Sequence, residues 1–195
     1  MMRIKKKSLK QLSNLMLTAG FLSQLFYSFS YPYIYAETLK AVSKSYISLE
    51  QILACLGTII LNDLWKHYGD KIYSHYIKIV ILEVIADIAL FGHVLVTGNL
   101  KFYFVFNIIV YALITKNMGC GGVKMRAKCN PTETAREGYD RNNEILLSIA
   151  TLIGAAAAIV FKIDLEWLFV FAFIGNIVDN FFYLYIYKQL RKIKE

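Results

Sequence analysis

Residues Tyr76 to Thr97 read YIKIVILEVIADIALFGHVLVT, and this stretch decides the fold class. It is longer than the roughly 20 mainly apolar residues that a helix needs to cross a bilayer. Apolar side chains occur all round the segment, whereas a membrane barrel strand would alternate apolar and polar residues. A backbone in lipid must satisfy its own hydrogen bonds, and a helix does so. The stretch therefore predicts a transmembrane helix.

Five further apolar segments lie on either side of this one. They cover residues 15–36, 49–65, 100–115, 144–161 and 165–187. Of the 195 residues, 57% are hydrophobic and 18% are charged, whereas a soluble domain carries about 25% charged residues. Six crossings with short connections account for the whole length. We therefore predict an all-α polytopic membrane protein with one six-helix transmembrane domain, residues 1–195.

Lysine and arginine residues are distributed unevenly between the two sides that six helices would define. Of the 22 in the chain, 18 fall on the side that holds both termini, and the other four are Lys40, Lys44, Lys101 and Lys162. Cytoplasmic loops of membrane proteins accumulate Lys and Arg. This bias explains the net charge of +8 without a nucleic-acid partner. It predicts a multi-pass protein of the plasma membrane with both termini in the cytoplasm.

Two acidic residues lie near the middle of the 76–97 segment. Glu83 and Asp87 are four residues apart, so they share one face of a helix. A charge at the bilayer centre costs about 2.5 to 3.5 kcal/mol on insertion scales, and intramembrane acids commonly mark ion and proton pathways. We predict that this pair carries protons. The alternative is a structural role, in an ion pair or hydrogen bond between helices.

A second polar group occurs in the last apolar segment. Asn176, Asp179 and Tyr183 follow one another at spacings of three and four residues, which places them on one helical stripe. We predict that they line a proton or substrate pathway, and the alternative is hydrogen bonding between helices. Weaker candidates of the same kind are Gln24, Tyr27 and Asn107.

Two polar stretches resemble parts of one half of a major facilitator superfamily transporter. A basic turn containing Gly69 and Lys71 follows Asp63, as between the second and third helices of each half in that family. The sequence REGYDRNN, residues 136–143, precedes an Ala- and Gly-rich segment, as before the family's fifth helix. The resemblance implies cytoplasmic gating loops that contain these residues, with Arg136 and Arg141 in the second. The family's turn motif itself is absent, since Asp63 lies six residues before Gly69.

The resemblance implies a half-size transporter. Each half of that family contains two inverted three-helix repeats, and Gly57 and Gly154 occur in similar small and apolar surroundings of the predicted second and fifth helices. One half does not enclose the family's substrate cavity. The resemblance therefore implies a homodimer, or a complex with a second half-size membrane subunit, that moves an unknown small molecule without a cofactor.

Three other interpretations stay open. The chain is compatible with a non-transporting accessory or immunity protein of the membrane, and with a truncated remnant of a longer transporter. The third is a membrane-embedded cysteine peptidase with Cys120 as its nucleophile, which needs a histidine to activate the thiol. His67 and His75 are predicted on the same side as Cys120, but no histidine precedes it at short range. We therefore predict that the protein is not an enzyme.

Metal and nucleotide sites are not indicated by the sequence. The three cysteines, Cys55, Cys120 and Cys129, have no closely spaced histidine partners, whereas a zinc site needs about four ligands. Glycine-rich phosphate loops and dinucleotide fingerprints are also absent from the sequence.

Overall fold

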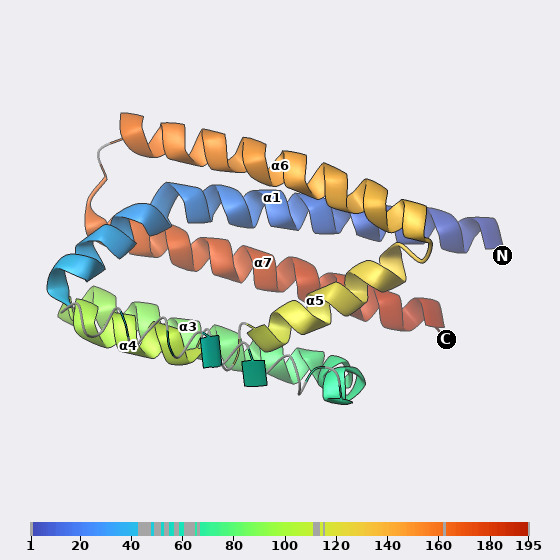
Figure 1. The fold of residues 1–195 in the computed structure, drawn as a ribbon, viewed down its shortest axis with the longest axis horizontal. Helices are drawn as coiled ribbons and strands as arrows, with labels where there is room; N and C mark the ends of the chain where they lie inside the picture. The colour runs from blue at the N-terminus through green and yellow to red at the C-terminus, as the bar shows by residue number, and fades with distance from the viewer. Residues whose placement is uncertain are drawn as a thin grey trace. The chain divides into compact units, whose positions relative to one another are not determined.

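The computed structural model is helical throughout its described part, which contains no strand, and this confirms the predicted all-α class (Figure 1). The helices are α1 (Met2–Ala41), α3 (Tyr76–Thr97), α4 (Leu100–Val110), α5 (Lys116–Cys129), α6 (Glu133–Val160) and α7 (Leu165–Lys194). The structure describes residues 2–42, 48, 52, 55–56, 59–60, 65, 67–110, 114, 116–161 and 163–194.

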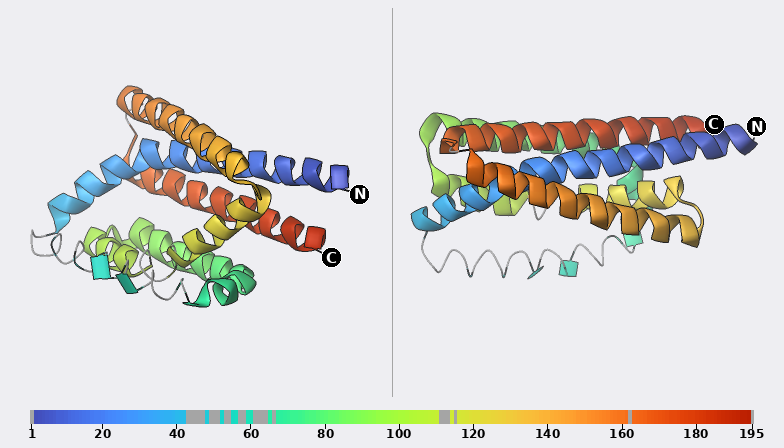
Figure 2. Two further views of the ribbon diagram at one scale, coloured as in Figure 1. Left: turned by 45° about the vertical axis from the view of Figure 1, so that its right-hand side comes forward. Right: turned by 90° about the horizontal axis from the view of Figure 1, so that it is seen from above.

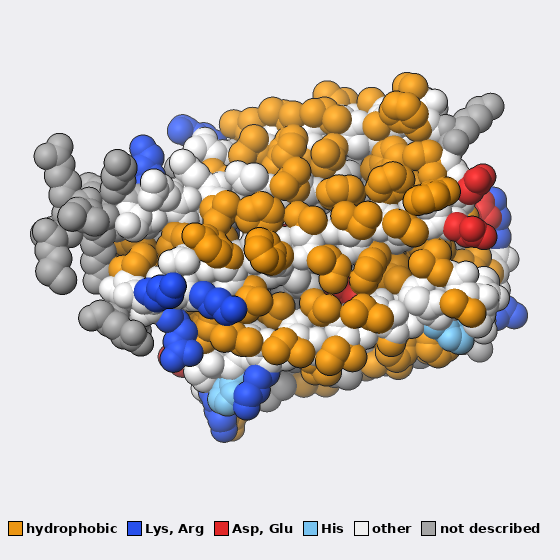
Figure 3. Space-filling model, turned by 180° about the vertical axis from the view of Figure 1, so that it is seen from behind, with side chains coloured by type: hydrophobic (Ala, Val, Ile, Leu, Met, Phe, Trp, Pro, Cys, Tyr) orange, Lys and Arg blue, Asp and Glu red, His pale blue; other side chains and the backbone are white. Residues whose placement is uncertain are grey.

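Three of these helices are long and apolar enough to cross a membrane. They are α3, α6 and α7, and α4 is a shorter apolar helix. Figure 3 shows hydrophobic side chains over most of the face that it draws, with few charged side chains among them. These helices indicate association with a membrane. The second predicted segment, residues 49–65, lies largely outside the described residues, and so do Gly57 and Asp63.

The bounds of α3 coincide with the predicted segment 76–97, whereas the stretch 116–143 differs from expectation. Residues 136–143 of this stretch are assigned by the resemblance to a cytoplasmic loop, and this expectation is wrong, because α5 and the first turns of α6 occupy the stretch. The turn between them ends at Thr132, whose hydroxyl accepts a hydrogen bond from the Ala135 amide at 3.3 Å. This N-cap satisfies one of the amides that a helix start leaves open. Glu133 in the first turn favours the helix start further.

The chain divides into two compact units. Unit 1 consists of Met1–Phe29, Gly122–Ile163 and Ile174–Glu195, and unit 2 consists of Ser30–Gly121 and Asp164–Phe173. Unit 1 thus contains the first part of α1, most of α5, all of α6 and the greater part of α7. Unit 2 contains α3, α4 and the remaining parts of α1, α5 and α7.

In unit 1, α6 and the first part of α1 lie side by side (Figures 1 and 2). Gly154 of α6 faces the α1 backbone directly, next to Leu25 and Phe29. Gly175 of α7 lies against the Phe26 side chain in the same way. The two chain ends and the start of α6 lie at one end of this unit (Figure 1). Glycines at these contacts let the helices approach closely, as is common between membrane helices.

In unit 2, α3 and α4 form a helical hairpin. Gly98 ends α3 with a φ of 64°, and its amide donates to the Val94 carbonyl at 2.8 Å. A residue with a side chain would be strained in this left-handed conformation. An aromatic cluster packs beside the hairpin, with the rings of Phe91 and Tyr103 against Phe169 of α7.

Candidate functional site

The two acidic residues of α3 are buried. Glu83 is 7% exposed and Asp87 is 4% exposed, on the face of α3 that also buries Val80 and Leu90. The opposite face carries only apolar side chains over the same turns, and each of them is more than half exposed: Ile81, Leu82, Ile85 and Ile88. The helix is therefore two-sided, with an apolar outer face and an inner face on which two carboxyl groups lie one turn apart.

The polar stripe of α7 lies in unit 1 and is buried unevenly. Asn180 is buried, Asp179 and Tyr183 are half-buried, and Asn176 is exposed. Asp179 and Tyr183 lie one helical turn apart on α7, and Tyr139 of α6 is buried in the same unit. Sequence reasoning did not single out Tyr139, although its burial follows the helical spacing of the α6 side that faces α1.

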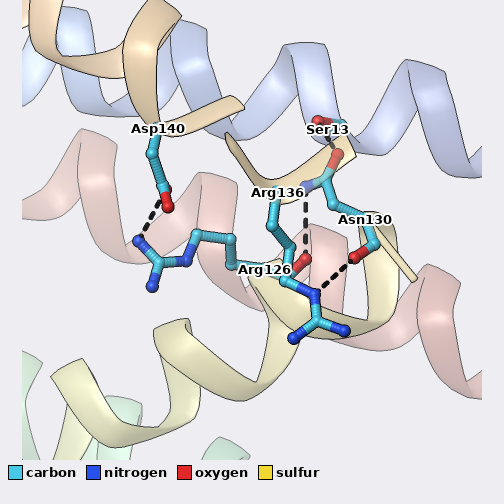
Figure 4. A network of polar contacts seen from close by, with 5 residues as sticks. All are labelled: Ser13, Arg126, Asn130, Arg136 and Asp140. Carbon is cyan, nitrogen blue, oxygen red and sulfur yellow. Dashed lines mark hydrogen bonds and ion pairs between the residues drawn. The ribbon is translucent and has the colours of Figure 1, made fainter. Parts of the chain in front are cut away.

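Asn130 is the centre of a polar network that sequence reasoning also missed (Figure 4). Its side-chain oxygen accepts a hydrogen bond from the Ser13 hydroxyl of α1 at 3.0 Å, and its amide nitrogen donates to the Arg126 carbonyl at 3.1 Å. Its own carbonyl accepts from Arg136 Nε at 3.2 Å. Both side chains of the Ser13–Asn130 bond are buried. The network ties the turn between α5 and α6 to α1.

An ion pair lies beside this network. Arg126 Nη1 of α5 donates to Asp140 Oδ1 of α6 at 2.9 Å (Figure 4). Both side chains are more than a third exposed, and ion pairs of this kind contribute about 0 to 1 kcal/mol to stability. This pair joins α5 to α6 at the residue that follows Tyr139 in the chain.

The weaker candidates differ from one another in burial and bonding. Gln24 of α1 donates to the Thr151 hydroxyl of α6 at 2.9 Å and to the Ser28 hydroxyl at 3.0 Å. This is an interhelical bond of the kind that the structural alternative predicts. Tyr27 is exposed on α1, and Asn107 is half-buried on α4 in unit 2.

The residues assigned to gating loops lie in helices where the structure describes them. Arg136 and Arg141 are exposed residues of α6, not of a loop, because that helix begins at Glu133. Residues 67–74 are also helical, with Gly69 buried and Lys71 exposed. The Arg136 side chain is held by the carbonyls of Asn130 and Pro131, so it supports the turn before α6.

Two of the three cysteines lie in the interior of the described part of the chain. Cys120 and Cys129 are both buried, and burial raises the pKa of the Cys129 thiol from 9.0 to about 11. Buried cysteines of this kind are chemically inert. His75 is exposed, and its Nδ1 lies 2.9 Å from the Lys71 carbonyl. Among the described residues, no group of three His, Cys, Asp or Glu side chains is placed to hold a metal ion.

Searches against protein-family models, curated proteins and solved structures found no match for this chain.

Proposed function

We propose that the protein is a half-size, proton-coupled membrane transporter of the major facilitator type. The observation that carries the proposal is the two-sided α3, with Glu83 and Asp87 buried opposite a fully apolar exposed face. Ionisable groups inside membrane proteins face the bundle interior and mark ion and proton relays. The pair would gain and lose protons as the transporter changes conformation. We propose separately that Asp179 and Tyr183 of α7, in unit 1, line a proton or substrate pathway.

The proposed topology has six transmembrane helices, the plasma membrane as its location, and both termini in the cytoplasm. The Lys and Arg distribution supports this orientation. So does unit 1, where the two chain ends lie at the same end as the start of α6 (Figure 1). An even number of spans is expected to give this arrangement. The first and last helices then cross the membrane in opposite directions, so both chain ends lie on the same side.

Cysteine labelling tests the orientation. We expect Glu137→Cys, before the apolar part of α6, to react with a membrane-impermeant maleimide only after cells are made leaky. Asp164→Cys, which follows α6, should react in intact cells. Both positions are exposed. The native Cys129 is an unsuitable reporter, because a pKa of about 11 in place of 9.0 lowers its thiolate fraction about 100-fold. The reverse labelling pattern would refute the proposed orientation.

A partner subunit is part of the proposal. Asn176 is exposed within the long apolar helix α7, and a polar group facing lipid without a hydrogen-bond partner is costly. A second copy of the chain, or a second half-size membrane subunit, would cover it. We expect mass measurement in nanodiscs to show a dimer or a stable complex with another membrane protein. A monomer without any co-purifying partner would contradict this part of the proposal.

Neutral variants of the α3 pair test the proposed function. Glu83→Gln and Asp87→Asn keep the size of each side chain but cannot carry a proton. We expect infrared titration between about pH 5 and 9, the range documented for buried acids, to show a carboxyl band that one of these variants removes. Once a substrate is known, the same variant should fold normally and lose pH-driven flux.

The control is Glu166→Gln, which changes an exposed carboxyl at the start of α7. It should leave the titrating band of the buried pair unchanged. If neither Glu83→Gln nor Asp87→Asn alters a band in this range, the pair does not exchange protons and the proton-coupling proposal fails.

A further inference from the structure

The last turns of α7 carry three basic side chains on their exposed side. Arg191 and Lys192 follow Lys188 at spacings of three and four residues, which place side chains on one helix face, and all three are exposed. The opposite side of the same turns is buried, with Ile186 0% and Leu190 6% exposed. The three cations therefore point away from the interior of unit 1.

The same side of α7 is apolar one turn earlier. Phe181 is 68% exposed and Tyr185 is 45% exposed, and both lie within a helix that is long and apolar enough to cross a membrane. Tyr185 precedes Lys188 by three residues and Lys192 by seven, so these side chains lie in one line along the helix. Tyrosine rings gather at the level where the hydrocarbon meets the headgroups. Tyr185 therefore marks the membrane boundary, and the cations lie just outside it.

Helix geometry gives the depth of the cations. A rise of about 1.5 Å per residue puts Lys188 about 5 Å and Lys192 about 11 Å beyond Tyr185 along the helix. The polar headgroup layer on each side of a bilayer is about 5 to 8 Å thick. Long basic side chains can also bend so that their charged ends reach a preferred level. The cations are thus within reach of the headgroup phosphates.

No acid offsets these charges on α7. The sequence has no acidic residue between Asp179 and the last residue, Glu195, and among the described side chains none forms an ion pair with the three cations. The start of α6, at the same end of unit 1, is different (Figure 1). Arg141 has Glu137 four residues before it and Glu144 three residues after it, so both acids share its helix face. The end of α7 therefore carries an uncompensated positive charge, whereas the start of α6 does not.

We propose that the basic end of α7, formed by Lys188, Arg191 and Lys192, binds the headgroup phosphate of an anionic phospholipid. The sequence adds a fourth cation, Lys194, and each Lys or Arg near a membrane surface favours anionic lipid by about fivefold. The guanidinium of Arg191 can bond two phosphate oxygens at once. In the orientation proposed above, this end faces the cytoplasmic leaflet, which is the anionic one. The inference needs α7 to span a membrane but does not need the protein to transport anything.

Two other roles of these cations lead to different expectations. Lys and Arg beside a membrane helix can serve only to set its orientation, and cations in the last turn of a helix interact favourably with the helix dipole. Neither role depends on which lipid surrounds the helix. A preference for anionic lipid in a bilayer whose two leaflets have the same composition therefore separates lipid binding from both.

A tryptophan reporter beside the basic end measures this preference. Tyr185→Trp would be made in the full chain together with Trp65→Phe and Trp167→Phe, which remove both native tryptophans. Nanodiscs would contain equal parts of phosphatidylglycerol and phosphatidylcholine, with one or the other lipid brominated. Bromine quenches tryptophan fluorescence at short range, so the two nanodiscs show which lipid lies beside the reporter. We expect brominated phosphatidylglycerol to quench clearly more strongly.

Glutamine variants connect the preference to the cations. Lys188→Gln, Arg191→Gln and Lys192→Gln should each lower the preference for phosphatidylglycerol about fivefold, and the triple variant should remove most of it. Because both leaflets are alike, a variant that inserts in the reverse orientation still gives a valid reading. Arg141→Gln is the matched control, since it removes an exposed cation at the same end of unit 1, and it should leave the preference unchanged.

Equal quenching by the two lipids in the reporter protein would overturn the proposal and leave the cations an orienting role. An equal loss of preference in Arg141→Gln and Arg191→Gln would also overturn it, because the effect would then come from the general charge of this end. If inorganic phosphate removed the preference at constant ionic strength, the ligand would be a soluble anion and not a lipid. Glu83→Gln and Asp87→Asn should not change the preference, so this proposal and the proposed transport fail independently.

Discussion

Replacing Gly154 with leucine is expected to separate α6 from α1 and to lower the stability of unit 1 strongly. A Cβ at this position would lie 2.8 Å from the Leu25 carbonyl oxygen and 3.1 Å from the Phe29 amide nitrogen. These are backbone atoms, so they cannot move aside as the end of a flexible side chain would. Overpacking by a few methylene groups typically costs about 1 to 3 kcal/mol, and leucine adds a whole side chain. We expect a cost of about 3 kcal/mol or more.

The matched control for this variant is Gly138→Leu on the same helix. No atom lies within 4 Å of a Cβ built at Gly138, and leucine is about 1 kcal/mol better than glycine in a helix. Thermal unfolding of the purified protein in mild detergent would compare the two variants. Gly138→Leu should unfold at or slightly above the wild-type temperature, and Gly154→Leu far below it. Equal unfolding temperatures would show that α1 and α6 do not pack through Gly154.

Introducing an acid on the outer face of α3 is expected to impair membrane insertion. Ile85 is 58% exposed and lies between Glu83 and Asp87 in the sequence, but on the opposite face. If that face contacts lipid, the carboxylate of Ile85→Asp lies near the bilayer centre without a partner. The expected cost is about 2.5 to 3.5 kcal/mol. The native acids avoid this cost because they point into the protein.

Val96→Asp is the control for depth. Val96 is more exposed than Ile85 but lies in the last turn of α3, two residues before Gly98. An acid near the membrane surface costs much less than one at the centre. The inserted fraction of each variant, measured in isolated membranes, should therefore be near the wild-type value for Val96→Asp and clearly reduced for Ile85→Asp. If the two fractions were equally high, the outer face of α3 would face water and not lipid.

The sequence alone was sufficient to predict α3 and its two faces. An apolar run long enough to cross a membrane forms a helix without help from neighbouring segments, since its backbone has no other way to satisfy its hydrogen bonds in lipid. The spacing of Glu83 and Asp87 then places them on one face by helical geometry. Both features are local, so no knowledge of the other helices was needed. Six spans and the orientation of the termini stay predictions.

The helices of the stretch 116–143 could not be predicted in the same way. The sequence of α5, KNMGCGGVKMRAKC, contains three glycines and no long apolar run, and glycine disfavours a helix by about 1 kcal/mol. Contacts with distant residues compensate for this. Gly121 packs against the Tyr76 ring in unit 2, and Asn130 accepts a hydrogen bond from Ser13 in unit 1, 117 residues away.

The sequence by itself determined the helical class, the bounds of α3 and the shared face of its acids, because helical periodicity is a property of neighbouring residues. Only the tertiary structure decided which side chains of different helices meet. It bonded Asn130 to Ser13, paired Arg126 with Asp140, and joined Gln24 to Thr151. Such pairings depend on which helices pack together and on the glycines at which they approach closely. The residue pattern within one helix does not specify which helix packs against it.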